Sequence, residues 1–173
     1  MNLFKSIYLS VLLYSLFSIS SYGQELYFAQ DPTLTPDGKT IIFSYDGDLW
    51  KVPTEGGNAY RITAMDGEES RPSISPDGKW IAFSSNQYGN RDIYIIPVKG
   101  GEIKQLTFHD GDDLVSSWSW DSKKIFFSSS RENSTSTYEI SVFGETPKRL
   151  FPHFFNRIHN VVQHPKDGSF FFN

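Results

Sequence analysis

The chain has 173 residues, a formal net charge of −4, 38% hydrophobic and 16% aromatic residues, and no cysteine. This length suits one domain, and the acidic balance provides no basic field that would attract nucleic acid. The absence of cysteine excludes disulfides, thiolate metal sites and a cysteine nucleophile.

Residues 1–23 have the features of a secretory signal peptide: a lysine near the start, a short apolar run over residues 7–19, and small residues before a cut at Gln24. The run is shorter than the roughly 20 apolar residues that span a bilayer. We therefore expect a secreted or periplasmic protein whose mature part, residues 24–173, has no membrane span.

Residues 71–107 predict one four-stranded antiparallel sheet. Pro76 and Gly78 form a tight turn, because proline presets a turn φ and glycine accepts a positive φ. Gly100 and Gly101 form a second hairpin turn. The expected strands are residues 72–75, 79–84, 92–98 and 103–107.

The same pattern recurs along the chain at a constant spacing. Trp50, Tyr94 and Tyr138 stand 44 residues apart and hold one position of the pattern. The copies cover about residues 26–63, 71–107 and 115–151, and a fourth begins at about residue 160.

A period in the forties with four short strands predicts an all-β protein, a β-propeller of four-stranded antiparallel blades. The strand at residues 80–83 is apolar on both faces, as a sheet stacked between two others requires. Propellers have about four to eight blades, so three copies and the start of a fourth indicate an incomplete propeller and an N-terminal fragment of a longer protein. An open β-sandwich is the rival architecture. We expect the isolated piece to be poorly soluble or to self-associate.

The third copy departs most from the pattern. Ser122 replaces the turn glycine, so its turn geometry is in question, and a Ser/Thr-rich loop over residues 128–137 predicts a flexible excursion. Asn133 begins a formal glycosylation sequon in that loop.

Four histidines are the first candidates for catalysis: His109, His153, His159 and His164. None stands beside a nucleophile motif such as G-x-S-x-G. Ser116, Ser117 and Asp112 are near His109 only along the sequence, and such motif-free residues are common in loops. The sequence therefore predicts no catalytic residue.

Two acidic loops, residues 46–48 and 110–113, resemble calcium loops at first sight. Both lack the EF-hand spacing, and the histidines lack the HExxH spacing of a zinc helix. We therefore expect no metal and no cofactor. The repeated aromatic position at Trp50 could form a stacking platform, but its regular recurrence favours packing between blades.

The repeated S-P-D-G-K-x-I-A-F-S, D-I-Y, G-G-E and Q-L-T segments resemble the propeller repeat of the TolB type, over about residues 26–172. Residues 48–53, 106–109 and 128–131 are most similar to the N-terminal propeller of tricorn protease homologues, and the repeats follow the signal peptide at once.

This resemblance implies a secreted serine peptidase whose propeller filters or guides peptides or unfolded proteins to PDZ and catalytic domains that residues 1–173 do not contain. No catalytic residue of the family maps onto this sequence. Two alternatives remain: the propeller of a dipeptidyl peptidase IV-like peptidase, and a non-enzymatic TolB-like propeller that binds protein partners.

Overall fold

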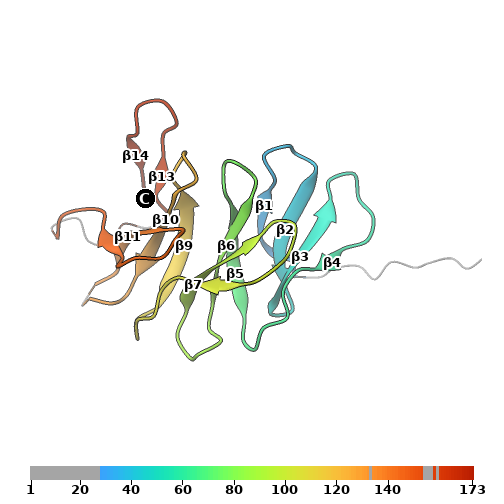
Figure 1. The fold of residues 1–173 in the computed structure, drawn as a ribbon, viewed down its shortest axis with the longest axis horizontal. Coiled ribbons are helices and arrows are strands. Elements are labelled where there is room, and N and C mark those ends of the chain that lie inside the picture. Colours follow the sequence, from blue (N-terminus) through green and yellow to red (C-terminus); the bar gives the residue numbers. More distant parts are fainter. Residues whose placement is uncertain (1–27, 133, 154–157, 159) are drawn as a thin grey trace, which may run out of the picture.

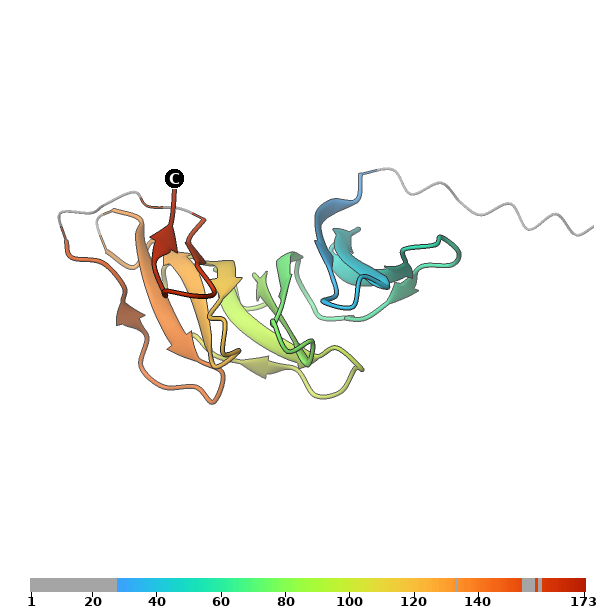
Figure 2. The ribbon, with the colours of Figure 1, turned by 90° about the horizontal axis from the view of Figure 1, so that it is seen from above.

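The computed structural model describes residues 28–132, 134–153, 158 and 160–173 and shows antiparallel sheets arranged along an arc (Figures 1 and 2). The expected signal peptide, residues 1–23, lies outside the described residues. Nowhere in the described part is there a helix long and apolar enough to cross a membrane.

Each sheet is one blade. Blade 1 comprises β1 (Gln30–Leu34), β2 (Thr40–Tyr45), β3 (Asp48–Pro53) and β4 (Tyr60–Arg61). Blade 2 comprises β5 (Glu69–Ile74), β6 (Trp80–Ser85), β7 (Asp92–Pro97) and β8 (Lys104–Gln105). Blade 3 comprises β9 (Asp113–Trp118), β10 (Lys124–Ser129), β11 (Ser136–Ser141) and β12 (Lys148–Arg149). The start of blade 4 comprises β13 (Val162–Gln163) and β14 (Phe170–Phe171). The expected incomplete β-propeller is confirmed.

The first strand of each blade lies nearest the axis of the arc. Within blades 1 to 3 the strands follow chain order across the sheet. The first strands of successive blades contact one another, β1 with β5, β5 with β9, and β9 with β13. These four strands therefore form the inner wall, along which a propeller has its central channel.

Blade 2 is apolar on both faces. Successive side chains of a strand point to opposite faces of the sheet, and in blade 2 both sets include apolar residues. Ile81 and Phe83 pack towards blade 1 with Ile42. Ala82, between them, packs on the other face with Val115 and other residues of blade 3. The alternation at residues 80–83 thus supplies side chains to two cores, and the sheet separates these cores.

The 44-residue spacing reproduces the same register in each blade. The pairs Ile41↔Val52, Ile81↔Ile96 and Ile125↔Ile140 occupy equivalent places in β2–β3, β6–β7 and β10–β11. Each copy therefore places equivalent residues at equivalent points in space, which allows one blade to be compared with the next.

The turn between the first two strands is alike in all three blades. In blade 2, the Ser75 hydroxyl donates to Asp77 at 2.7 Å and the Lys79 N–H donates to the same carboxylate at 3.1 Å. In blade 3, Ser122 takes φ 60°, close to the 70° of Gly78. The turn geometry is thus retained without glycine, in a conformation that side chains resist.

Three sequence expectations need correction. The fourth strand of blade 2 is β8, Lys104–Gln105, rather than residues 103–107. Strand β5 begins at Glu69 rather than at residue 72, because a bulge at Arg71 interrupts the pairing without ending the strand. The expected excursion at residues 128–137 begins and ends inside β10 and β11, and its Arg131 folds back onto the blade. Asn133, the sequon residue, lies outside the described residues.

Candidate binding sites at the channel and between the blades

Four polar residues lie at one level of the inner wall, where a closed propeller has its channel. Asp31 and Arg71 stand at bulges of β1 and β5 with φ of 49° and 51°, and Asn160 precedes β13 with φ 50°. Ser116 is the bulged residue of β9. All four line one cavity of about 380 Å³. We call these four residues the channel ring.

The channel ring offers both hydrogen-bond donors and hydrogen-bond acceptors. The Arg71 N–H donates to the Asp31 carboxylate at 2.9 Å and so ties two blades together. The Ser116 hydroxyl is buried and has no hydrogen-bond partner among the described residues. Non-glycine residues at positive φ are strained, and such strain gathers at functional sites. The channel ring therefore offers hydrogen-bond donors and acceptors to a ligand at the inner wall.

A second polar feature is a pair of carboxyls at each of the first two blade junctions. Asp48 and Glu69 face each other between blades 1 and 2, and Asp92 and Asp113 between blades 2 and 3. In each pair the second acid stands 21 residues after the first and begins the next blade's inner strand.

Glu69 is 2% exposed. It accepts hydrogen bonds from the Thr63 hydroxyl at 2.8 Å and the Ser85 hydroxyl at 3.3 Å. Burial, opposed by these hydrogen bonds and aided by the neighbouring Asp48 carboxyl, raises the pKa of Glu69 to about 7. Arg61, at 3.2 Å from Asp48, neutralises only the other member of the pair.

The junction between blades 2 and 3 contains a cation. Arg131 lies 2.7 Å from the Asp113 carboxylate and donates to the Ser129 hydroxyl at 2.7 Å. Its guanidinium also stands over the rings of Phe127 and Tyr138, at 5.4 and 4.6 Å from their centroids. Here the buried acid is compensated by a cation–π-stacked arginine.

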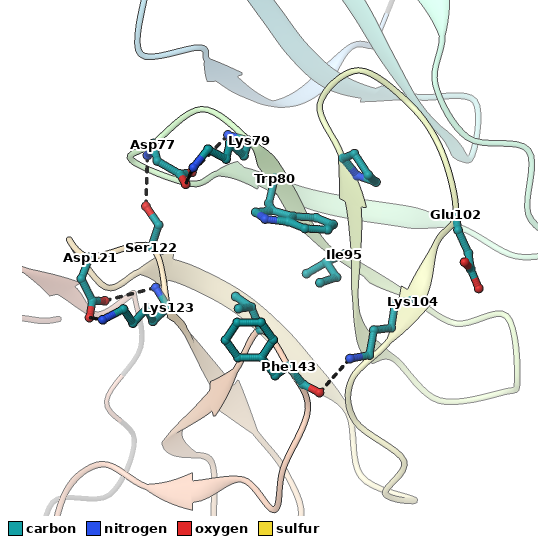
Figure 3. A pocket seen from close by; sticks show the side chains of 12 residues that line it. Asp77, Lys79, Trp80, Ile95, Glu102, Lys104, Asp121, Ser122, Lys123 and Phe143 are labelled. Carbon is teal, nitrogen blue, oxygen red and sulfur yellow. Dashed lines mark hydrogen bonds and ion pairs between the residues drawn. The ribbon is translucent and has the colours of Figure 1, made fainter.

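An apolar cavity of about 550 Å³ opens between blades 2 and 3 at the end that carries the Pro-Asp-Gly turn. Figure 3 shows Trp80 and Ile95 on one side and Phe143 on the other, with Lys104 at the rim. The Lys104 ammonium donates to the Phe143 carbonyl at 2.8 Å and joins the two blades. This cavity suits an apolar side chain.

These features can be set beside known proteins. A family model described as the tricorn protease N-terminal beta propeller domain matches residues 27–170. The chain belongs to this family. Tricorn protease homolog 1 of Streptomyces coelicolor is 34% identical over 58 residues, which cover 34% of this chain and 5% of that protein.

Two solved structures show the same arrangement of blades. The crystal structure of the tricorn protease superposes with a TM-score of 0.70 at 21% identity, covering 86% of this chain and 15% of that one. TolB from Acinetobacter baumannii gives the same TM-score at 25% identity, covering 84% of this chain and 37% of that one. The chain thus spans a minor part of the length of each of these proteins.

The three described histidines of this tricorn-type propeller lie apart, each with a local partner. His109 Nδ1 accepts the Gly111 N–H at 2.9 Å, and His164 Nδ1 lies 2.9 Å from Asp167. His153 lies 3.6 Å from Glu132. His159 is outside the described residues. Within the described ranges no hydrogen bond joins a histidine to a serine side chain, so the structure assembles no serine–histidine pair there.

The serines and the acidic loop near His109 have structural contacts. The Ser117 hydroxyl donates to the Val161 carbonyl across the inner wall. Asp112 accepts the Arg91 N–H at 2.8 Å. In the described part of the chain, no three or more His, Asp or Glu side chains gather so that they could hold a metal ion.

The repeated aromatic position belongs to the blade packing. Tyr94 stacks on Phe83 with centroids 5.7 Å apart, and Tyr138 stacks on Phe127 at 5.9 Å. Trp50 is half-buried and donates its indole N–H to a carbonyl of its own blade. These contacts agree with the packing role expected from the repeat.

Sequence reasoning missed Glu69, Arg131 and the channel ring. The 21-residue spacing between Asp48 and Glu69, repeated at the next junction, is visible in the sequence. This spacing predicts a pair of neighbouring carboxyls only when one knows that the third strand of a blade begins beside the inner strand of the next blade.

Proposed function

We propose that this tricorn-type propeller admits and guides unfolded peptides for a serine-type peptidase. The observation that carries the proposal is the channel ring, which places three residues at strained positive φ and one unpartnered hydroxyl, that of Ser116, on the inner wall of a family member. An extended peptide has unpaired N–H and C=O groups, and polar side chains on a channel wall can satisfy them. Peptide hydrolysis itself we assign to residues beyond those described.

The proposal includes export. Residues 1–23 have the pattern of a cleaved signal peptide, so we place the mature propeller outside the cytoplasm. N-terminal sequencing of the protein recovered from the periplasm or medium is expected to begin at Gln24. A protein recovered with Met1 intact would contradict this part of the proposal.

Peptide binding can be tested by blocking the channel. Thr33 lines the cavity of the channel ring, so Thr33→Trp in the full chain should obstruct it. We expect at least tenfold weaker binding of fluorescein-labelled casein peptides by anisotropy. Glu55→Trp, on the exposed outer hairpin of blade 1, is the matched control and should bind as the parent does. Equal affinities for both variants would refute peptide entry through the channel.

A non-enzymatic binding module is the second candidate, because TolB superposes as well as the tricorn protease does. The two functions differ in their chemistry. A peptidase containing this propeller should react with a serine-directed fluorophosphonate and lose peptide hydrolysis together with that labelling. Peptide binding by the natural full chain without labelling or hydrolysis would favour the binding module.

A further inference from the structure

Blade 3 shows what lies at a blade junction where the buried acid is paired with an arginine, although Asp113 Oδ1 has no hydrogen-bond partner among the described residues. The Arg131 side chain is 14% exposed and bridges Asp113 on the inner strand to Ser129 on the second strand. Its guanidinium lies over the stacked rings of Phe127 and Tyr138. A carboxylate, a hydroxyl and two aromatic rings thus surround this guanidinium.

The same walls recur in blade 2, 44 residues earlier. Glu69 pairs with Ser85 across β5 and β6, as Asp113 pairs with Ser129 across β9 and β10. Phe83 and Tyr94 stack at 5.7 Å and an interplanar angle of 21°, against 5.9 Å and 27° in blade 3.

The residue that supplies the cation differs between the blades. Gln87 stands where blade 3 has Arg131. The loop that carries it is anchored alike in both blades: a Cβ on Gly67 would meet Gln87 N at 2.9 Å, and one on Gly111 would meet Arg131 N at 2.8 Å. Blade 2 therefore has a carboxyl, a hydroxyl and two stacked rings like those around the Arg131 guanidinium, but no arginine at the equivalent position.

Polar groups at this junction are left without partners. Tyr94 is 3% exposed and Ser44 is 8% exposed. The hydroxyls of both residues are buried and have no hydrogen-bond partner among the described residues. In blade 3 the Tyr138 hydroxyl donates to Glu132 at 2.6 Å, but blade 2 has Tyr88 in place of that glutamate. Unpaired buried polar groups are costly and favour a ligand that can bond to them.

An acidic cavity of about 400 Å³ opens at the edge of this junction. Glu69 and Ser44 are its most buried lining residues, and Asp46 and Glu68 line it at the exposed side. Arg91 lies 3.5 Å from Glu68 and is the only cationic residue among the described residues that line the cavity. Asp46 and Glu68 carry two negative charges against the one positive charge of Arg91, and Glu69 adds to this excess when it is ionised, so the cavity would attract a cation.

We propose that the junction between blades 1 and 2 binds the guanidinium of an arginine side chain in a peptide. The inference rests on the proposed peptide handling and gives it a side-chain preference. Glu69 would accept N–H groups of the guanidinium, and the rings of Phe83 and Tyr94 would lie beside it, as Phe127 and Tyr138 do for Arg131. A planar guanidinium fits such a site better than an ammonium, because it stacks on rings and donates in a fixed fork.

The first test titrates the full chain with N-acetyl-arginine amide and follows binding by calorimetry. N-acetyl-citrulline amide is the probe's neutral isostere, and N-acetyl-lysine amide tests an ammonium. We expect the arginine probe to bind at least tenfold more tightly than either. Equal binding of the arginine and citrulline probes would overturn the proposal.

Variants locate the binding. Glu69→Gln should weaken binding of the arginine probe at least tenfold, whereas the exposed Glu55→Gln should leave it unchanged. Gln87→Arg should fill the site from within, as Arg131 does in blade 3, and abolish binding while raising the midpoint of thermal unfolding. Gln87→Met keeps the length without the charge and should still bind. Undiminished binding by Gln87→Arg would refute the site.

The outcome separates this inference from the function it rests on. Casein-peptide binding that Thr33→Trp weakens and Gln87→Arg leaves unchanged, for arginine-containing and arginine-free peptides alike, would support channel entry and overturn the arginine site. Casein-peptide binding that Thr33→Trp leaves unchanged, together with retained binding of the arginine probe, would support the arginine site and overturn the guiding role of the channel.

Discussion

Replacing Glu69 by glutamine should stabilise the folded chain above neutral pH and leave its stability unchanged in acid. Burial, with the neighbouring Asp48 carboxyl, raises the pKa of Glu69 from 4.5 to about 7. A group whose pKa is higher in the folded than in the unfolded chain favours folding fully below the unfolded value. That contribution is lost as the pH rises from about 4.5 through about 7.

The size of the effect follows from the difference between these two pKa values. It corresponds to about 3 kcal/mol of unfolding free energy that the parent loses between acid and mildly alkaline pH. Glutamine has the same shape, keeps an acceptor for the Thr63 hydroxyl and does not ionise. At pH 8.5 the variant should therefore exceed the parent by up to about 3 kcal/mol, or roughly 6–12 °C in the midpoint of thermal unfolding.

Unfolding in urea at pH 4, 5.5, 7 and 8.5, followed by tryptophan fluorescence, measures this difference. The exposed Glu55→Gln serves as the control and should show no pH-dependent difference from the parent. A gain for Glu69→Gln that is equal at all four pH values would show that the buried charge is not its cause.

Three further predictions rest on matched pairs or single changes. Tyr94→Phe removes an unpaired buried hydroxyl and should stabilise the chain by about 1 kcal/mol, whereas Tyr138→Phe breaks a hydrogen bond to Glu132 and should cost about 1 kcal/mol; urea unfolding that gives both the same sign would contradict this. Gly67 and Gly57 share φ 117°, but only at Gly67 would a Cβ approach other atoms within 3 Å, so Gly67→Ala should lower the unfolding free energy by about 2 kcal/mol more than Gly57→Ala; equal losses would refute the steric account. Residues 24–173 produced alone should self-associate in sedimentation velocity, and Phe171→Ser, which removes a ring that is 62% exposed, should reduce this association; a monodisperse parent would exclude it.

Most of the fold could be predicted from the repeat. The 44-residue spacing between Trp50, Tyr94 and Tyr138 predicts blades of equal register, and the alternation at residues 80–83 predicts a sheet with two covered faces. The fourth strand of blade 2 is shorter than expected. β8 has two residues, and it is the edge strand of its sheet, so it pairs with β7 alone. The bulge at Arg71 could not be foreseen, since the proline that follows it, Pro72, can equally be the first residue of a strand.

The candidate sites were much less accessible to sequence reasoning. Asp31, Arg71 and Ser116 are different residue types without a motif, and only the bulges bring them to one level of the channel. Glu69 and Gln87 become informative through comparison with Asp113 and Arg131, which requires knowing that both pairs face a neighbouring blade. Side-chain partners across a junction depend on how two copies of the repeat stack, which the period alone does not specify.

The two-faced character of blade 2 has a consequence for how such a protein is assembled. Its face towards blade 1 differs from its face towards blade 3, so each junction is a head-to-tail contact between unlike surfaces of one repeating unit. In assemblies of separate subunits, contacts of this kind produce closed rings when the rotation per step divides a full turn and open filaments when it does not. A propeller is in this sense a ring oligomer whose subunits share one covalent chain, and the angle set at each junction determines whether the ring can close.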